Sequence, residues 1–357
     1  MRKNCYIIIC LCLPIFYSCN KNGENISKPL HVYIAGYVHE YAGQKQFARY
    51  WKDGVAVNLT DGSKPAMASS IVVSGNDVYV AGWELESTGS GDTAVAKYWK
   101  NGNAVSLTDG SKIAYATSIA VSGSDVYVAG YEWVIPFTIA AAKYWKNEII
   151  VNLTDGTKDS RAESITVSGN DVYVAGWERN GSGRTVAKYW KNGIAVNLSD
   201  GSRDACATSV AVSGNDVYVA GFQYSTSVTA KYWKNGNPVD ITDGTKTAFA
   251  YSLVLSENDI YTAGSEWART FNFVEVARYW KNGIAVSLTD SSRSSAVTSI
   301  AVSGNDVYTT GWQYHPVTSG PTSPVVMYWK NKDAVNLSDS TGVLNTCQAF
   351  SIFLAEQ

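Results

Sequence analysis

Short runs of β-branched and aromatic residues, separated by turn-forming residues, fill the chain from about residue 30 onward. Residues 69–109 illustrate the pattern with the runs S-S-I-V-V-S, D-V-Y-V-A-G-W-E, A-V-A-K-Y-W-K and A-V-S-L-T-D. Each run has the length of a strand, and the apolar positions show no helical period. Gly75-Asn76 and Asn101-Gly102 suit two-residue hairpin turns, because these turns need residues that tolerate positive φ. The pattern therefore predicts four antiparallel strands, A to D, joined by short turns.

This four-strand unit occurs seven times in fixed register. The dipeptide Tyr-Trp recurs every 43 to 49 residues, together with V-Y or I-Y followed three residues later by Gly, and with a Ser in strand A. The Tyr-Trp pairs begin at Tyr50, Tyr98, Tyr144, Tyr189, Tyr232, Tyr279 and Tyr328. Seven four-stranded repeats are typical of a β-propeller. We predict an all-β fold in which residues 30–357 form a single seven-bladed β-propeller with four antiparallel strands per blade.

The phase of the repeat predicts how the ring closes. The first strand of the repeat region, residues 31–37, is a strand B, and the last, residues 349–355, is a strand A. Neither end of this region holds a complete blade, so the first blade must be assembled from both ends of the chain. Their pairing closes the ring and holds segments that would otherwise fray.

Length variation is concentrated in one connection of the repeat. The interval from the strand B Gly to the next Tyr-Trp varies from 11 to 17 residues, whereas the other intervals are constant apart from an insertion near Leu344. Antiparallel strands place these B–C loops on the same face as the D–A crossovers, opposite the constant hairpins. Binding usually resides in loops on a rigid scaffold, so we predict that this face is the functional one.

The twelve Trp fall into two groups. Seven belong to the Tyr-Trp pairs, whose rings lie on opposite sides of strand C and are predicted to pack between neighbouring blades. The other five follow the strand B Gly by one or three residues, and Glu or Gln stands two residues after that Gly in six units. The candidate rim residues are Trp83 and Glu84, Trp133 and Glu132, Trp177 and Glu178, Trp267 and Glu266, and Trp312 and Gln313. An exposed indole beside a carboxylate or amide can hold a sugar ring, but the rings can equally cap the blade core.

Acidic residues recur at the D–A crossovers, and six of the seven precede Lys or Arg by three positions. They are Asp61, Asp109, Asp155, Asp200, Asp243, Asp290 and Asp339. Asp-Gly is ordinary turn chemistry, so turn and ion-pair roles are favoured over a cation bound on the axis. His39 and His315, predicted in the B–C loops of blades 1 and 7, are interpreted as incidental and not as a zinc site. We predict no metal and no other cofactor.

The first nineteen residues differ from the repeats. Arg2 and Lys3 precede an apolar stretch that ends at Ser18 and Cys19, after which the sequence turns polar. This leader resembles the lipobox of bacterial lipoproteins. The resemblance implies that residues 1–18 are a signal peptide, that Cys19 is lipidated, for example with palmitate, and that residues 19–29 form a tether. We expect a bacterial cell-envelope protein anchored to the membrane, in particular the outer membrane, at its periplasmic or surface face. An ordinary cleaved signal peptide is the alternative.

Composition narrows the classes of partner. A formal net charge of −2 with 17% charged residues gives no electrostatic reason to expect nucleic acid or direct binding to an anionic membrane surface. Once the leader and Cys19 are set aside, Cys206 and Cys347 remain, three blades apart. We expect two buried thiols and not a disulfide. We also expect a monomer.

The unit V-Y-V-A-G-W-E followed by A-K-Y-W-K-N-G resembles the kelch repeat, with Ala-Gly in place of Gly-Gly and with Tyr and Trp adjacent. The resemblance covers the chain from about residue 30 and implies the fold, but kelch-type folds host both binding modules and oxidases. No nucleophile motif, phosphate-binding Gly loop or H-E-x-x-H motif occurs in the sequence. We expect a module that binds a glycan or an envelope protein through its variable-loop face. The main alternative is an enzyme acting on envelope polysaccharide, a hydrolase or lyase, that uses rim carboxylates such as Glu84 or Glu178. A purely scaffolding role is the third.

Overall fold

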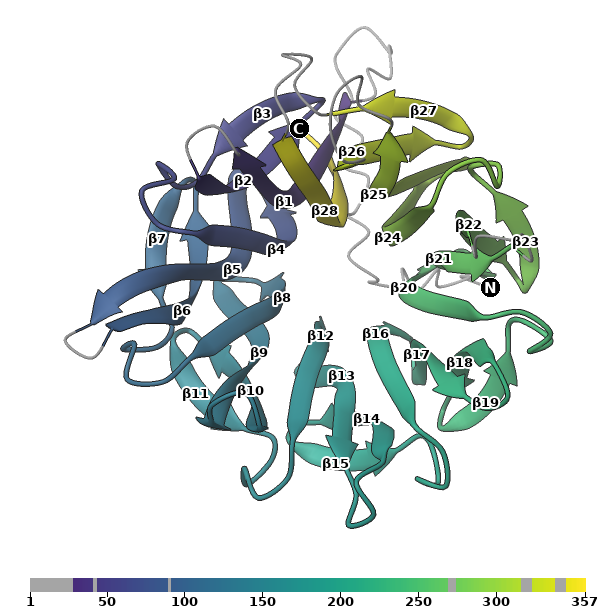
Figure 1. Ribbon diagram of the computed structural model, residues 1–357, viewed down its shortest axis with the longest axis horizontal. Coiled ribbons are helices and arrows are strands. Elements are labelled where there is room, and N and C mark those ends of the chain that lie inside the picture. Colours follow the sequence, from purple (N-terminus) through teal and green to yellow (C-terminus); the bar gives the residue numbers. More distant parts are fainter. Residues whose placement is uncertain (1–27, 41–43, 89–90, 269–273, 316–322, 338–344) are drawn as a thin grey trace, which may run out of the picture.

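The computed structural model describes residues 28–357 except 41–43, 89–90, 269–273, 316–322 and 338–344. The described residues form seven four-stranded antiparallel sheets, which stand as blades around a central axis (Figure 1). The predicted seven-bladed β-propeller is confirmed. The predicted signal peptide, Cys19 and all but the end of the tether lie outside the described residues. Within the described part, no helix is long and apolar enough to cross a membrane.

Strands A to D follow one another from the axis outward in every blade (Figure 1). The A strands of blades 1 to 7 are β28 (Asn345–Glu356), β4 (Ala66–Ser74), β8 (Ala114–Ser122), β12 (Ser160–Ser168), β16 (Ala205–Ser213), β20 (Ala248–Ser256) and β24 (Ser295–Ser303). The B strands are β1 (Leu30–Glu40), β5 (Asp77–Thr88), β9 (Asp125–Ile135), β13 (Asp171–Arg179), β17 (Asp216–Tyr224), β21 (Asp259–Trp267) and β25 (Asp306–His315). The C strands are β2 (Lys45–Lys52), β6 (Gly91–Lys100), β10 (Ile139–Lys146), β14 (Thr185–Lys191), β18 (Val228–Lys234), β22 (Glu275–Lys281) and β26 (Ser323–Lys330). The D strands are β3 (Val55–Asn58), β7 (Asn103–Ser106), β11 (Ile149–Asn152), β15 (Ile194–Asn197), β19 (Asn237–Asp240), β23 (Ile284–Ser287) and β27 (Asp333–Asn336).

The two ends of the described chain complete blade 1. Strand β28 pairs antiparallel with β1 from Leu30↔Glu356 to Glu40↔Asn345, which places the yellow C-terminal strand against the purple first strand in Figure 1. The predicted closure is confirmed, and both strands are longer than the sequence pattern indicated.

The recurrent Ser of strand A links each blade to the next. Its Oγ accepts a hydrogen bond from the backbone N–H of the residue that follows the equivalent Ser in the next blade. In the closing blade, Ile352 donates to Ser299 (3.2 Å) and Ser351 accepts from Ile71 (3.3 Å). All seven junctions carry this bond, so the series runs unbroken around the ring and passes through the C-terminal strand.

The Tyr-Trp pairs fill the spaces between blades. Each of the seven Trp is about 1% exposed. Every hydrophobic cluster combines the Tyr of one blade with the Trp of the next, as Tyr98 does with Trp145. The predicted packing role is therefore confirmed, and it explains why Tyr and Trp must be adjacent. Neighbouring residues of a strand point to opposite faces of the sheet, and each blade has a neighbour on both faces.

A β-bulge in strand A explains the recurrent Gly of strand B. In blade 4 the register of β12 against β13 shifts between Ala162 and Ser164. A Cβ placed on Gly176 would lie 2.0 Å from the carbonyl oxygen of Arg161, so only glycine fits. The hairpin turns follow the prediction, with φ of 51° at Asn101 and 81° at Gly102.

Candidate binding site

The five rim Trp lie on the face of the B–C loops, but they differ in exposure. Trp133 is 9% exposed and Trp267 is 37% exposed, while Trp83, Trp177 and Trp312 lie between these values. Because the Trp and the Glu or Gln of each blade are consecutive in strand B, their side chains point to opposite faces of the sheet. The structure therefore does not bring each indole together with its neighbouring carboxylate or amide.

The rim carboxylates are instead held by cations of strand C. Glu84 lies 2.8 Å from Lys97, and Glu132 lies 3.0 Å from Lys143. Glu178 pairs with Lys188, and Glu266 lies 3.5 Å from Arg278. These cations directly precede the Tyr-Trp pairs and are largely buried. The carboxylates thus belong to a layer of ion pairs inside the blades.

The Trp join residues that the sequence analysis missed. Ring centroids lie 5.5 Å apart for Trp83 and Tyr115, 5.3 Å for Tyr115 and Tyr131, and 6.1 Å for Tyr131 and Trp133. The guanidinium of Arg161 lies 4.7 Å from the centre of the Tyr131 ring and 5.4 Å from those of Trp133 and Trp177. We name the following set, from blades 2 to 4, the Arg161 cluster: Trp83, Tyr115, Tyr131, Trp133, Arg161, Glu163 and Trp177.

Strand register explains how the cluster forms. In blades 2 to 7 the second residue of strand A lies opposite the residue that follows the Gly of strand B, so Tyr115 pairs with Tyr131 and Arg161 with Trp177. Directly opposed residues point to the same face of a sheet. Arg161 therefore joins Tyr131 and Trp133 of blade 3 to Trp177 of its own blade 4, at the end of strand A where the D–A crossover enters.

Electrostatic attraction to the surrounding rings favours one fixed position of the Arg161 guanidinium. Three rings attract the Arg161 guanidinium through cation–π contacts, and its buried Nε has no hydrogen-bond partner among the residues that the structure describes. Glu163 accepts a hydrogen bond from Trp177 Nε1 at 3.2 Å. Burial raises the pKa of the Glu163 carboxyl above its ordinary value, and the charge of Arg161 partly opposes this rise. Burial likewise raises the pKa of Tyr131 to about 12.

Apolar side chains extend the cluster into solvent. Phe137, at the tip of the β9–β10 connection, is 74% exposed, and its ring lies 5.7 Å from that of Trp133. Val134 and Ile135 beside it are also exposed. A run of aromatic rings ending in an exposed apolar tip is a surface suited to binding.

A second aromatic run occupies blades 5 and 6. Phe222 contacts Phe249 (5.0 Å) and Tyr224 (5.9 Å), and Phe249 stacks on Tyr251 at 5.9 Å. The contact of Phe222 in strand B of blade 5 with Phe249 in strand A of blade 6 is equivalent to that of Trp83 with Tyr115, but no cation lies over the rings of this run in the described residues.

The crossover Asp residues act in turns. Asp61 accepts a hydrogen bond from the backbone N–H of Ser63 at 2.8 Å, and the five other described Asp bond their i+2 residues in the same way. Asp339 lies outside the described residues. The ion pairs differ from the prediction, because Lys112 and Lys246 pair with the strand B carboxylates Glu132 and Glu266.

The structure also places the histidines and cysteines that the sequence analysis discussed. His39 lies within β1, and His315 ends β25, so neither belongs to a loop as predicted. The described part of the chain holds no group of three or more His, Cys, Asp or Glu that could bind a metal ion. Cys206 and Cys347 form no disulfide with each other in the structure, and Cys347 is buried as predicted, whereas Cys206 is only half-buried.

Solved structures align with most of this chain but with only about half of their own length. A puromycin-hydrolysing peptidase of Mycobacterium tuberculosis aligns with a TM-score of 0.58 and 11% identity over 86% of this chain and 51% of that chain. An uncomplexed acylaminoacyl peptidase of Pyrococcus horikoshii aligns with a TM-score of 0.53 and 10% identity over 88% of this chain and 52% of that chain. The chain thus spans about half the length of these peptidases, and identities this low show the fold only. No protein-family model and no curated protein sequence matches the chain.

Proposed function

We propose that this protein is a lipid-anchored envelope propeller that binds a partner protein through the Arg161 cluster and Phe137. The observation that carries the proposal is the continuous set of Trp and Tyr rings around one arginine, on the face with the variable loops. Trp, Tyr and Arg dominate the energetics of protein interfaces, and anchors held rigid before binding lose little entropy. The exposed apolar side chains at the tip of the β9–β10 connection add surface that a protein partner would cover.

The geometry does not favour the alternative of a polysaccharide hydrolase or lyase. A hydrolase needs two carboxyl groups that face one another about 5–10 Å apart. Glu84 and Glu178 each pair with a strand C lysine inside their own blade. Catalysis by either would first have to break an ion pair that is largely buried.

Site-specific photo-crosslinking tests the proposed interface. We would place a photoreactive amino acid at Phe137 in the full chain, expressed in the producing cells. The matched control carries it at Ile194, which is 73% exposed on the outer strand of blade 4. We expect one discrete crosslinked protein from position 137 and none from position 194.

Binding of the purified partner then tests the arginine. We expect Arg161→Ala to weaken the dissociation constant at least ~30-fold, the effect of removing a hot-spot residue worth about 2 kcal/mol. Phe137→Ala, which changes an exposed side chain, guards against misfolding and should weaken binding several-fold with an unchanged melting temperature. Wild-type affinity of both variants for the partner would refute the proposal, and so would polysaccharide turnover that Glu84→Gln abolishes.

The proposed lipid anchor is tested separately. We expect the full chain to incorporate radiolabelled palmitate and to partition into detergent, and Cys19→Ala to lose both properties. A chain that is cleaved but unlabelled would favour the ordinary signal peptide.

A further inference from the structure

In two blades a strand B carboxylate bridges two cations. Glu132 Oε1 lies 3.0 Å from Lys143 of strand C and 3.1 Å from Lys112 of the D–A crossover. Blade 6 repeats the arrangement, with Glu266 Oε1 at 3.5 Å from Arg278 and 3.0 Å from Lys246. In both blades one carboxylate therefore balances a cation from each side.

Blade 5 keeps both cations but lacks the carboxylate. Gln223 stands at the position of Glu132 and Glu266, while Arg203 occupies the crossover position and Lys231 the strand C position. Lys231 turns instead to Asp240 of β19, whose side chain is 60% exposed. Asn or Ser stands at the Asp240 position in the other six blades.

Blade 7 shows that an amide alone does not produce this arrangement. It also carries an amide, Gln313, at the strand B position. Its strand C position holds Met327 and not a cation. The combination of an amide with two cations therefore sets blade 5 apart from blade 7.

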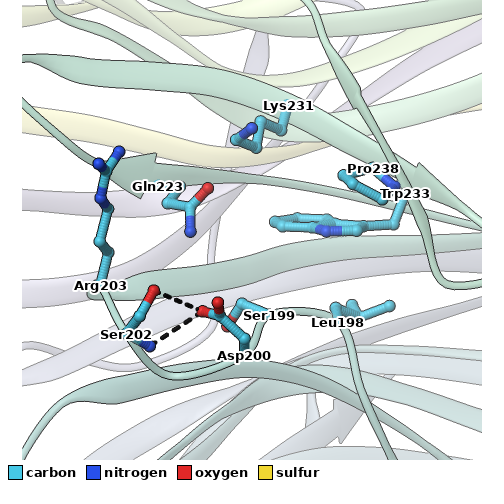
Figure 2. A pocket seen from close by; sticks show the side chains of 9 residues that line it. All are labelled: Leu198, Ser199, Asp200, Ser202, Arg203, Gln223, Lys231, Trp233 and Pro238. Atoms are coloured by element: carbon cyan, nitrogen blue, oxygen red, sulfur yellow. Dashed lines mark hydrogen bonds between the residues drawn. The ribbon is translucent and has the colours of Figure 1, made fainter.

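A cavity of about 450 Å³ opens at this place in blade 5. Figure 2 shows Gln223 between the Arg203 guanidinium and the Trp233 indole, with Lys231 on one side and Asp200 with Ser202 on the other. The other residues that line the cavity are Leu198, Ser199 and Pro238. The B–C connection of blade 5 is the shortest in the chain, 11 residues from Gly221 to Tyr232, so the least chain is available to cover the opening.

We propose that this cavity binds the carboxylate of a small polyhydroxylated ligand, a sugar acid. The ligand carboxylate lies between Arg203 and Lys231 and takes the role that Glu132 and Glu266 have in their blades. Arginine can hold a carboxylate through two parallel hydrogen bonds, and charge-assisted bonds of this kind are stronger than neutral ones. Because Asp240 is exposed, its pairing with Lys231 is weak and can give way to the ligand.

The rest of the lining fits hydroxyl groups. Asp200 accepts hydrogen bonds from Ser202 through one carboxylate oxygen, Oδ1. Its other oxygen can accept from a sugar hydroxyl, and the Gln223 amide can both donate and accept. Pro238 and the edge of Trp233 offer a small apolar wall for the CH groups of the ring. This site lies in blade 5 and does not depend on the Arg161 cluster or on the proposed protein partner.

Calorimetry with the full chain tests the proposal, with glucuronic acid, glucose and alanine as probes. We expect glucuronic acid to bind at least tenfold more tightly than glucose, which lacks the carboxylate, and than alanine, which lacks the hydroxyls. Arg203→Ala should weaken glucuronic acid binding at least tenfold. Lys158→Ala, the equivalent crossover change in blade 4, is the matched control and should leave binding unchanged.

A second variant fills the site from within. Gln223→Glu with Asp240→Asn gives blade 5 the residues of blade 4, Glu178 and Asn197, and should abolish binding while the melting temperature is kept. Equal binding of glucose and glucuronic acid, alanine binding as tight as glucuronic acid binding, no binding of glucuronic acid, or full binding by the double variant would each overturn the proposal.

Discussion

The bridging carboxylate of blade 3 provides a test of the ion-pair layer that underlies both the rim and the blade 5 cavity. Glu132→Gln removes the charge that serves Lys143, whose side chain is 11% exposed, and Lys112, whose side chain is 51% exposed. Breaking a buried pair costs about 3–5 kcal/mol, because the remaining charge is left uncompensated. The Gln oxygen still accepts one hydrogen bond and Lys112 is open to solvent, so we expect a loss of about 2 kcal/mol.

The loss can be measured by urea denaturation followed by Trp fluorescence, with calorimetry alongside. An unfolding entropy of about 2.1 cal/mol/K per residue over ~330 residues gives roughly 0.7 kcal/mol per degree, so the melting temperature should fall by about 3 °C. A second substitution can restore a carboxylate beside Lys143. Asn152 lies opposite Lys143 in the register of β10 with β11, just as Asp240 lies opposite Lys231 in blade 5. We expect Asn152→Asp to restore at least half of the loss in the Glu132→Gln background and to add little in the wild-type background.

The wild type, Glu132→Gln, Asn152→Asp and the double variant form a double-mutant cycle. The cycle measures the coupling free energy between positions 132 and 152 directly. A Glu132→Gln variant within about 0.5 kcal/mol of wild type would show that the strand C lysines do not need a carboxylate. An equal effect of Asn152→Asp in both backgrounds would show that the new Asp stabilises the blade without meeting Lys143. Either result would also remove the physical reason given for the carboxylate preference of the blade 5 cavity.

Three further predictions follow from the fold. Gly176→Ala should cost about 3 kcal/mol in urea denaturation, because its Cβ would lie 2.0 Å from a backbone oxygen, whereas Gly181→Ala, with open space around it, should be neutral. Deleting residues 350–357 removes two of the seven inter-blade Ser bonds and opens the ring, so the calorimetric transition should broaden and move down by many degrees; an unchanged melting temperature would contradict ring closure. Burial raises the pKa of Cys206 to about 11 from 9.0, so at pH 8 its thiolate fraction falls by roughly 100-fold. Iodoacetamide should therefore label it far more slowly than free cysteine at pH 8 and faster as the pH rises towards 11, and labelling at the rate of free cysteine would contradict its burial.

The fold could be predicted from the sequence because its constraints recur. Tyr-Trp must be adjacent to face both neighbours and the strand B Gly must accommodate the bulge, so both leave the same mark in every repeat. The hairpin turns need positive φ, which favours Gly or Asn there in most repeats, although Glu148 and Glu257 also adopt it. The phase of these marks was sufficient to predict that β28 completes blade 1.

The candidate site was predicted less well because its residues do not recur from repeat to repeat. The second position of strand A holds Met67, Tyr115, Arg161, Cys206 and Phe249 in successive blades, while the residues on either side stay small. That contrast was the available signal for the Arg161 cluster. A position that varies within an otherwise fixed repeat is not required for the packing that all blades share. Sequence reasoning also placed each rim Trp together with the Glu or Gln next to it. Consecutive residues of a strand point to opposite faces of the sheet, so the two side chains do not lie together.

Blade 5 differs from blades 3 and 6 by the absence of one negative charge in strand B, Gln223 in place of Glu132 and Glu266. Replacement of a bridging Glu by Gln would normally leave Lys231 uncompensated, but Asp240 on the next strand supplies a carboxylate from the solvent side. The lysine thus remains paired in the folded protein while the space between it and Arg203 is open. A ligand carboxylate must then compete with Asp240, so binding exchanges one ion pair for another and gains mainly from Arg203. It follows that affinity for a sugar acid should be modest and should weaken with salt, and that Asp240→Asn alone should tighten it while lowering stability.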